Sequence, residues 1–345
     1  MSRHHSHIAS AIKIIVSASA GEPLAHHLKK FFAADKKFGS KDRKAISSLC
    51  YNYYRLGNAL KDKTAEERIL AGCFLGAGGK SDLLDNRAPE LNEKMHWSRE
   101  KKLAFLKITG DDIFIYSKAL SNEIDVAGFV ASFSQQPLFF LRIRPGKATK
   151  VLEKLTAAKA EFTEISTSCI ALPPASKTDE LIKLNKDAVV QDLNSQQVFN
   201  YLQQDGVFLS KDATVWDCCA GSGGKSILLY DMLHGHASLH VSDVRENILH
   251  NLRNRFKDAG ILNYQSFLTD LSAENVSLPG KQFELIICDA PCTGSGTWAR
   301  NPEQLIFFDE KAIDEYAEKQ KKIAATAARA LKPGGLFFYI TCSGF

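Results

Sequence analysis

The chain has 345 residues, of which 45% are hydrophobic and 24% are charged, a balance typical of an ordinary globular protein. This length allows two or three domains. No apolar run reaches the roughly 18 residues of a membrane-spanning helix, and no repeat or low-complexity tract is visible, so the sequence excludes membrane-spanning and repetitive proteins.

The net charge of +5 is unevenly distributed along the chain. Residues 1–150 hold 25 Lys and Arg against 15 Asp and Glu, a balance of +10, whereas residues 151–345 hold 19 against 24, a balance of −5. A basic half joined to an acidic half indicates a separate module that binds a polyanion. A solvated lysine-rich surface would give the same pattern.

The compartment is predicted from the N-terminus and the cysteines. The first twenty residues, MSRHHSHIASAIKIIVSASA, place apolar residues at helical spacing, which favours an amphipathic helix over a secretory signal. The eight cysteines form no CxxC pair and no clustered histidines accompany them, so neither a zinc site nor a disulfide framework is predicted. We expect a cytoplasmic protein without a metal, in which most cysteines are small buried hydrophobic residues.

The first 120 residues are predicted to form a helical domain. Apolar residues recur at three- and four-residue spacing in PLAHHLKKFFAAD and in SKDRKAISSLCYNYYRLGNAL, and Ser40 is a plausible N-cap of the second helix. A basic turn, KKFGSKDRK, joins them.

Residues 121–204 are predicted to form a small α+β module, because the spacing of apolar residues changes near Pro137 from a helical pattern to alternating strand-like and helical runs. The predicted strands are PLFFLRIRP, FTEISTSCIALPP and AVVQD, and the predicted helices are KATKVLEKLTAAK, TDELIKL and SQQVFNYLQQ.

Residues 205–345 are predicted to form an α/β domain with a Rossmann-like, doubly wound parallel sheet. The predicted strands are ATVWDCC, ASLHVSD, NYQSFLTD, FELIICDAP and GLFFYITCS, and the helices between them are KSILLYDML, ENILHNLRNRFKDAG and DEKAIDEYAEKQKKIAATAARAL. Ligands of such sheets bind beyond the carboxyl ends of the strands.

A glycine-rich turn, WDCCAGSGGKS, follows the first of these strands. It ends like a triphosphate-binding loop, but that loop requires a glycine five residues before Gly224, where this chain has Cys219. A dinucleotide fingerprint that begins at Gly221 fails at its third glycine, where Ser226 stands. The turn therefore predicts close backbone approach to a ligand without a phosphate clamp.

Acidic residues end three successive predicted strands at Asp217, Asp243 and Asp270. An acid at the tip of the second strand suits ribose hydroxyls, and the absence of a phosphate clamp favours a nucleoside without phosphate. S-adenosylmethionine fits best, with its ribose, amino-acid tail and sulfonium. Acids that merely cap turns and helices are the alternative.

Two cysteines lie at the tips of the last two strands, Cys292 in DAPC and Cys342 in TCS, and Asp289 accompanies them. A thiolate can add to an electron-poor carbon, and carbon 5 of cytosine accepts a methyl group only after such addition at carbon 6. Asp289 is the candidate to hold the N3 edge of the ring, which requires proton sharing. Chemistry alone does not decide which thiol is the nucleophile.

These motifs resemble those of the Sun family of RNA cytosine-C(5) methyltransferases, and most of all its bacterial enzymes that modify small-subunit ribosomal RNA. The resemblance covers nearly the whole chain and includes DCCAGSGGKS, SDVREN, DAPCTGSGTWARNPE and YITCS. PLAHHLKKFF and KFGSKDRKAISSLCYNYYR resemble the family's NusB-like RNA-binding domain. The DAPC and TCS pair, in that order after a Gly-Gly-Lys loop, is highly specific.

The resemblance implies a role for each motif residue. It makes Cys342 the nucleophile, gives Cys292 a part in product release, and places Arg300, Asn301 and Pro302 in an RNA-contacting loop. It also implies that S-adenosylmethionine binds at Cys219, Ala220, Gly221, Ser222, Gly223, Gly224, Lys225, Asp243, Asp270 and Asp289.

Two departures from the family pattern are visible. The loop has Gly221-Ser222 where Ala-Pro is commoner, and the chain stops three residues after Cys342, where family members continue. We therefore expect a C-terminally short catalytic domain with a tip prone to fraying. The alternatives are a non-catalytic RNA-binding or ribosome-assembly factor, and a methyltransferase for a protein or small molecule, which would leave both thiols unexplained.

Overall fold

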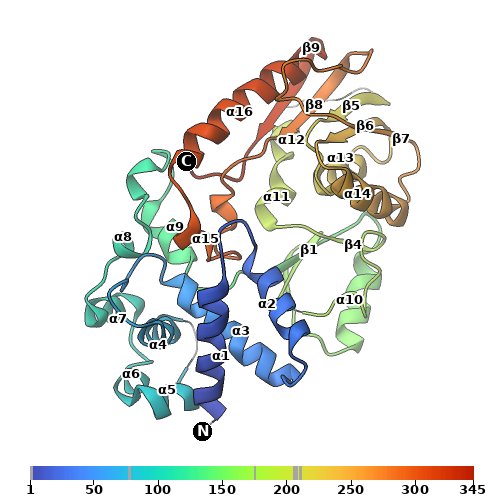
Figure 1. Cartoon of the computed structure of the whole chain (residues 1–345). Helices are drawn as coiled ribbons and strands as arrows, with labels where there is room; N and C mark the ends of the chain where they lie inside the picture. The colour runs from blue at the N-terminus through green and yellow to red at the C-terminus, as the bar shows by residue number, and fades with distance from the viewer. Residues whose placement is uncertain (1–2, 77–78, 175, 205–208, 210–211) are drawn as a thin grey trace. The chain divides into compact units, whose positions relative to one another are not determined.

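The computed structural model of the chain describes residues 3–76, 79–174, 176–204, 209 and 212–345 (Figure 1). They fall into two compact units. The first unit comprises Met1–Pro137, Thr293–Ile313 and Cys342–Phe345, and the second comprises Leu138–Cys292 and Asp314–Thr341. The chain thus leaves the first unit and returns to it twice. The predicted domain start at residue 205 lies outside the described residues.

The first unit is helical, as the sequence predicts. Its helices are α1 (Arg3–Ser17), α2 (Leu24–Ala34), α3 (Ser40–Arg55), α4 (Ala65–Leu75), α5 (Asp82–Arg87), α6 (Pro89–Glu93), α7 (Arg99–Leu106), α8 (Gly110–Ile113), η1 (Ser117–Ala119), α9 (Val126–Ser132), η2 (Ser295–Thr297) and α15 (Gln304–Phe307). Buried side chains such as Ile14, Ile46 and Phe74 form its core. The predicted cap of α3 is wrong by one residue, because Gly39 is the N-cap and Ser40 begins the helix.

The segment Thr293–Ile313 is part of this helical core although it follows the DAPC motif in sequence. The buried Glu303 carboxylate accepts a hydrogen bond from the Leu24 amide at the start of α2, at 2.9 Å. The Asn58 side-chain amide donates to the Leu305 carbonyl at 2.8 Å. These two bonds attach the segment to the start of α2 and to the turn after α3, both far away in sequence.

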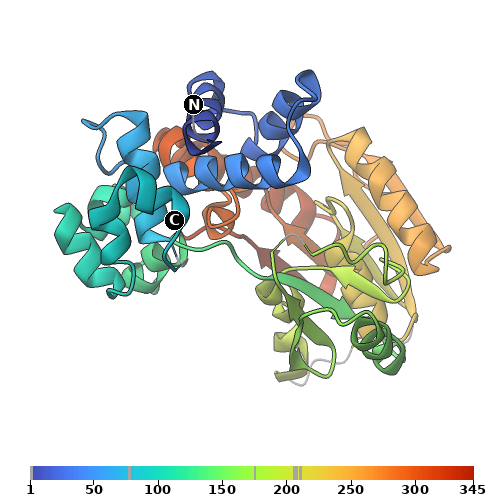
Figure 2. The same ribbon diagram turned by 90° about the horizontal axis from the view of Figure 1, so that it is seen from below.

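The second unit begins with a four-stranded antiparallel sheet of order β2-β3-β1-β4. Its strands are β1 (Phe139–Ile143), β2 (Thr163–Ser166), β3 (Cys169–Leu172) and β4 (Ala188–Val190), and helix α10 (Ala148–Ala157) follows β1. Figure 2 shows α10 beside these strands in green. Leu141 and Ile170 pack against Val151 and Leu155 of the helix.

Three predictions for this module are wrong in detail. FTEISTSCIALPP is not one strand but the hairpin of β2 and β3, because its run of Ser and Thr makes a turn in which Ser166 Oγ accepts from the Ser168 amide. TDELIKL closes one turn, from the Ile182 amide to the Thr178 carbonyl at 2.8 Å, and forms no helix. SQQVFNYLQQ is divided between α11 (Leu193–Gln197) and α12 (Asn200–Gln204).

The larger sheet of the second unit is parallel throughout, with order β7-β6-β5-β8-β9, as the sequence predicts. Its strands are β5 (Ala213–Asp217), β6 (Ala237–Asp243), β7 (Tyr264–Leu268), β8 (Phe283–Asp289) and β9 (Leu331–Ile340), and its helices are α13 (Gly224–Met232), α14 (Glu246–Ala259) and α16 (Lys311–Ala328). None of the helices in the described ranges is long and apolar enough to cross a membrane.

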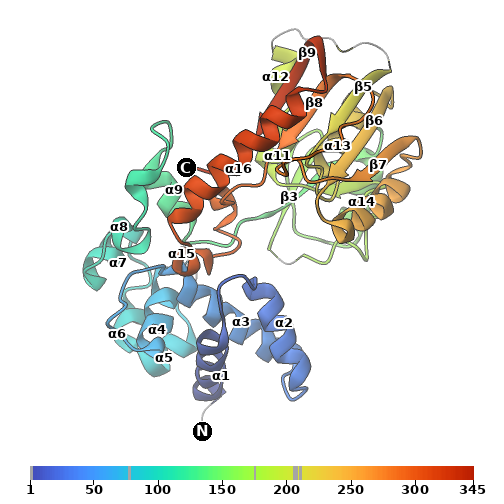
Figure 3. The ribbon, with the colours of Figure 1, turned by 45° about the horizontal axis from the view of Figure 1, so that its top comes forward.

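Helices cover both faces of this sheet, as Figure 3 shows. Val215 of β5 packs with α13 and α14, whereas the next residue, Trp216, packs with Ile323 and Ala327 of α16. Burial of neighbouring residues on opposite faces explains the continuous apolar runs of the strands. Because helices cover both faces of the sheet, the carboxyl ends of the strands are the edge at which polar residues come together.

The turn between β5 and α13 depends on two glycines with left-handed backbone, Gly221 (φ +53°) and Gly223 (φ +81°). Their surroundings differ. A Cβ at Gly223 would lie 2.7 Å from Phe256 Cε1 and 3.1 Å from Leu252 Cγ, both on α14, whereas a Cβ at Gly221 would meet nothing within 4 Å. Gly223 is thus required for close packing as well as for conformation.

We predict that Gly223→Ala lowers the free energy of unfolding by about 2–5 kcal/mol. A left-handed alanine costs about 1–2 kcal/mol, and overpacking against α14 adds about 1–3 kcal/mol. Gly221→Ala is the matched control, because it carries the conformational cost but no overpacking against α14. Urea titrations of both variants measure the difference, and equal losses would contradict the packing role of Gly223.

Candidate functional site

The glycine-rich turn is held by backbone hydrogen bonds to the strands on either side of β5. The Cys218 amide donates to the Ile287 carbonyl of β8 at 2.9 Å, and the Ala220 amide donates to the Ser242 carbonyl of β6 at 2.9 Å. The turn is therefore fixed at the carboxyl edge of the sheet, where parallel α/β sheets bind ligands.

Asp243 ends β6 beneath this turn, and its side chain is only 5% exposed. Its carboxylate accepts from the Gly221 amide at 3.0 Å, from the Arg245 amide at 3.0 Å, and from the Arg245 guanidinium at 2.9 and 3.1 Å. Burial raises the pKa of Asp243, but the hydrogen bonds from Arg245 and Gly221 outweigh it, so the net shift is downward. Asp243 is therefore a charged acceptor that fixes the turn.

Asp217 ends β5 and is almost fully buried. One carboxylate oxygen accepts from the Ser226 hydroxyl at 2.6 Å, whereas the other is buried without a hydrogen-bond partner among the described residues. Burial raises the pKa of Asp217 to about 7, and the Ser226 bond opposes this shift only in part. The Asp217 side chain therefore points toward α13, which carries Ser226.

Two further acids occupy the same edge. The Asp289 carboxylate, at the end of β8, pairs with the Lys225 ammonium at 2.5 Å. The exposed Asp270, which follows β7, accepts from the Ser272 hydroxyl at 2.6 Å and amide at 2.9 Å, and these bonds lower its pKa. Lys225 thus offsets the charge of the acid that begins the DAPC motif.

A pocket of about 410 Å³ opens at this edge of the sheet, within the size range of small-molecule sites. It brings together five of the predicted site residues from four different segments, namely Cys219, Asp243, Asp270, Asp289 and Cys292. Other predicted residues of the turn are connected to it, because the Gly221 amide binds Asp243 and Lys225 binds Asp289.

Sequence reasoning missed one wall of the pocket. Tyr316, Lys319 and Ile323 of α16 line it, as does Arg245, which holds Asp243. Spacings of three and four residues place the α16 side chains on one helix face. This spacing could have identified the wall from the sequence, since the long helix between two strands must turn one face toward the sheet.

Three cysteine sulfurs lie close together at the base of the pocket, although one of the three residues is distant from the other two in the sequence. The Sγ atoms of Cys218, Cys219 and Cys288 all lie within 4.8 Å of one another. Hydrogen bonds from Cys218 and Cys219 lower the pKa of Cys288 to about 5, and the same contacts raise the pKa of Cys218. Cys218 and Cys288 are buried.

Cys342 belongs to the first unit, whereas the pocket and Cys292 belong to the second. Cys342 is exposed and follows the end of β9 by two residues. Its carbonyl accepts from the Gly296 amide at 2.8 Å, and the Gly344 amide donates to Ser295 Oγ at 2.8 Å. The residues around Cys342 are therefore hydrogen-bonded to the segment that follows DAPC.

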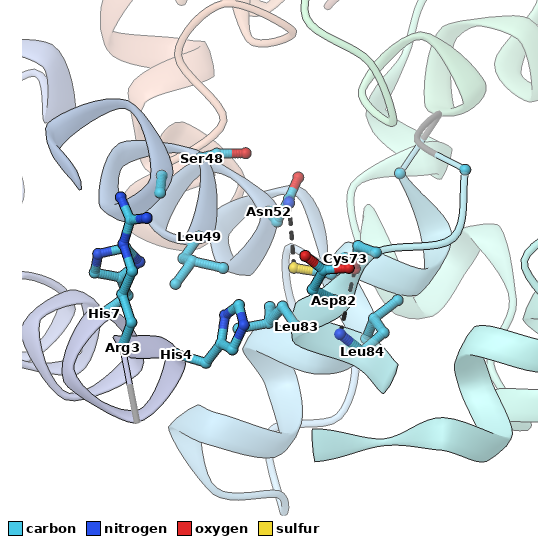
Figure 4. Close-up of a pocket in the computed structure, with 14 residues that line it drawn as sticks. Arg3, His4, His7, Ser48, Leu49, Asn52, Cys73, Asp82, Leu83 and Leu84 are labelled. Carbon is cyan, nitrogen blue, oxygen red and sulfur yellow. Dashed lines mark hydrogen bonds between the residues drawn. The ribbon is translucent and has the colours of Figure 1, made fainter. Parts of the chain in front are cut away.

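A separate hollow of about 540 Å³ lies among α1, α3, α4 and α5 in the helical unit. Figure 4 shows Arg3, His4 and His7 along one side of it and Asn52 with Cys73 along another. Arg3 and His7 both contact the Asp42 carboxylate at 2.9 Å. The Asp42 carboxylate therefore offsets the charge of the Arg3 guanidinium at this side of the hollow.

Comparison with known proteins agrees with the fold and the motifs. Residues 207–344 match the family model described as 16S rRNA methyltransferase RsmB/F. The chain is 26% identical over 221 residues to the probable ribosomal RNA small subunit methyltransferase B of Synechocystis, an alignment of 62% of this chain with 48% of that protein. It is 32% identical over 157 residues to the ribosomal RNA small subunit methyltransferase B of Vibrio vulnificus, an alignment of 45% of this chain with 34% of that protein.

Solved structures share the fold. The crystal structure of PH0851 matches with a TM-score of 0.70 at 19% identity, over 99% of this chain and 87% of that one. A methyltransferase homolog protein from Pyrococcus horikoshii matches with a TM-score of 0.52 at 22% identity, over 72% of this chain and 74% of that one.

The fold is thus that of an α/β methyltransferase joined to a helical region. Residues 207–344 match the RsmB/F model, which agrees with the resemblance to the Sun family seen in the sequence. The alignments with the Synechocystis and Vibrio vulnificus relatives cover less than half of the length of those proteins.

We predict that Asp217 makes the chain less stable as the pH rises. Its pKa is about 7 in the folded chain and about 3.9 when unfolded, so the folded state binds the proton more tightly. The stability due to this proton is fully present below about pH 4 and is lost as the pH rises through 7. Asp217→Asn removes the titration, so its stability relative to the unsubstituted chain should increase between pH 4.5 and 7.5.

Urea titrations at several pH values measure this difference. Asp270→Asn is the control, because its lowered pKa confines its titration to acid pH, and its difference from the unsubstituted chain should stay flat above pH 5. Parallel stability curves for Asp217→Asn and the unsubstituted chain would contradict the prediction.

Proposed function

We propose that this chain is a cytoplasmic, S-adenosylmethionine-dependent methyltransferase that modifies carbon 5 of a cytosine in ribosomal RNA. The observation that carries the proposal is the pocket that gathers Cys219, Asp243, Asp270, Asp289 and Cys292 at the carboxyl edge of the parallel sheet. The names of the relatives, which are ribosomal RNA small subunit methyltransferases, support the substrate class.

The pocket fits the cofactor in size and in the chemistry of its donors. Asp243 is the residue to accept the ribose hydroxyls, and the turn Cys219–Lys225 offers backbone groups to the amino-acid tail. The carboxylate of Asp243 already accepts four hydrogen bonds, two of them from the Arg245 guanidinium. The Arg245 side chain is 59% exposed, so the proposal has it move away from Asp243 when the ribose binds, while the two backbone donors keep Asp243 in place.

The cofactor supplies an electrophilic methyl group. In the proposed reaction the Cys342 thiolate adds to carbon 6 of cytosine, and ring N3 accepts the proton that Asp289 shares with it, while Lys225 positions the Asp289 side chain. The addition makes carbon 5 nucleophilic enough to accept the methyl group. Cys292 then accepts the carbon 5 proton, N3 returns its proton to Asp289, and expulsion of the Cys342 thiolate re-forms the ring double bond and releases 5-methylcytosine.

The helical unit is the proposed RNA-docking module, similar to a NusB-like domain. Around the turn between α2 and α3 the unit has three acids, Glu22, Asp35 and Asp42. The same region exposes seven basic residues, namely Lys29, Lys30, Lys36, Lys37, Lys41, Arg43 and Lys44. Such a surface favours the phosphate backbone of a folded RNA. The target cytosine would then have to be unpaired or flipped out to react.

We predict that Asp243→Asn weakens S-adenosylmethionine binding by about 10- to 100-fold. The change removes the charge of the ribose acceptor, and a hydrogen bond to a charged group contributes about 1.5–3 kcal/mol. Arg245→Ala is the matched control, because it frees two acceptor sites on Asp243, and its affinity should be equal or higher. Isothermal titration calorimetry measures both, and an unchanged affinity in Asp243→Asn would contradict the assignment.

We predict that Cys342→Ser abolishes methyl transfer from labelled cofactor to 16S ribosomal RNA. Cys292→Ser should instead accumulate a covalent protein–RNA adduct, visible on a denaturing gel, because addition proceeds while release is slowed. Cys73→Ala, a cysteine outside the proposed reaction, should leave transfer unchanged.

Full activity of Cys342→Ser would overturn the nucleophile assignment. Methylation that survives the Cys342 and Cys292 double substitution would favour a protein or small-molecule substrate. Salt-sensitive RNA binding without cofactor binding would favour an RNA-binding or assembly factor.

A further inference from the structure

The cluster of three thiols at the base of the pocket is a feature that cytosine methylation does not use. Cys218 is 2% exposed and Cys288 is fully buried, and Cys219 is partly buried. Their Sγ atoms lie within 4.8 Å of one another. Neither the proposed nucleophile nor the proposed release cysteine belongs to the cluster.

The fold places the three thiols together through strand pairing. Asp217 of β5 stands opposite Ile287 of β8 in the parallel register. The Cys218 amide continues this ladder by donating to the Ile287 carbonyl at 2.9 Å. The next residue of β8, Cys288, therefore lies beside Cys218, and the turn brings Cys219 over both. The arrangement is fixed by backbone hydrogen bonds rather than by side-chain rotamers alone.

We propose that Cys218, Cys219 and Cys288 form a binding site for a single soft metal ion, and that the ligand set suits Cu(I). Thiolate sulfur is a soft donor that selects Cu(I), zinc and iron–sulfur clusters over magnesium, calcium and manganese. The metal site shares Cys219 and the pocket with the proposed cofactor site, but the proposed reaction uses none of the three thiols.

The number of sulfur donors distinguishes among the soft ions. Within the described ranges the cluster contains three cysteines and no histidine or carboxylate. Zinc takes four ligands, so three sulfurs would hold it only with a water at the fourth position, and iron–sulfur clusters ordinarily require four cysteines. Three sulfurs suffice for Cu(I), which accepts low coordination numbers.

Access and charge also favour a cation. Cys218 and Cys219 both line the 410 Å³ pocket, and so do the carboxylates of Asp243 and Asp289. An ion can therefore reach the sulfurs through the pocket, past acids that attract it. Each thiol that binds Cu(I) releases its proton to solvent, and the ion keeps its oxidation state.

The competing interpretation is that the thiols are apolar core residues, since Cys218 and Cys288 pack with Trp216, Phe283 and Ile286. A core role predicts that the sulfurs are replaceable by alkyl groups with no loss other than stability. Metal binding predicts a loss of Cu(I) affinity even in variants that keep their stability.

The test uses the full chain with Cys292 and Cys342 replaced by serine, so that their thiols do not compete for the ion. Under anaerobic conditions this protein is titrated against the Cu(I)–bicinchoninate complex, whose absorbance reports transfer of the ion. We expect one equivalent to be withdrawn from the chelator, and copper X-ray absorption to show sulfur ligands only.

Two further variants in the same background decide the assignment. Cys288→Val preserves a buried strand residue and should weaken Cu(I) binding by at least about 100-fold, because loss of a residue that merely supports a metal ligand already costs about 10- to 100-fold. Cys169→Val, in β3 and outside the cluster, should leave it unchanged. Circular dichroism and thermal unfolding verify that both fold.

Failure of the parent protein to withdraw one equivalent would overturn the proposal. So would equal Cu(I) affinity in folded Cys288→Val and Cys169→Val. If Cys288→Val fails to fold, Cys219→Ala replaces it, because Cys219 lies on the turn and is only partly buried, and unchanged affinity in that variant would likewise overturn the proposal.

Discussion

The close approach of the β5–α13 turn to α14 is the constraint on which the candidate site depends. Gly223 leaves no room for a side chain against Phe256 and Leu252, so the turn passes directly over the end of the sheet. The amides of Cys218 and Ala220 bond to the strands on either side. These contacts place backbone, acids and thiols around one pocket, since each adjacent strand ends at the same edge.

Carboxylates gathered at one edge of the sheet repel one another when charged, and each is stabilised by a different set of contacts. Asp243 stays charged because Arg245 and backbone amides donate to it. Asp289 has Lys225 as its counter-charge. Within the part of the chain that the structure describes, Asp217 accepts one hydrogen bond, from Ser226, and burial raises its pKa to about 7. The site thus combines charged acceptors that face the pocket with one acid beneath it that holds a proton more easily.

Much of this organisation was predictable from the sequence, because strong local patterns encode it. The parallel sheet follows from apolar runs between long helices, and the ligand edge follows from acids at the strand ends. The unpredicted parts depend on non-local contacts. Cys218 and Cys288 meet only through strand register, Tyr316 reaches the pocket from a helix close to the C-terminus, and the β2–β3 hairpin and the TDELIKL turn depend on short polar segments with weak periodicity.

The two units carry different parts of the proposed chemistry. The residues proposed to hold the cofactor, and Cys292, belong to the second unit, whereas Cys342 belongs to the helical unit with the basic surface of α2 and α3. Within that unit, Cys342 bonds to Gly296, and the segment that contains Gly296 is attached to α2 through Glu303. The helical unit therefore supplies the proposed nucleophile as well as the RNA-docking surface, and its folding is a requirement for the proposed reaction rather than an accessory to it.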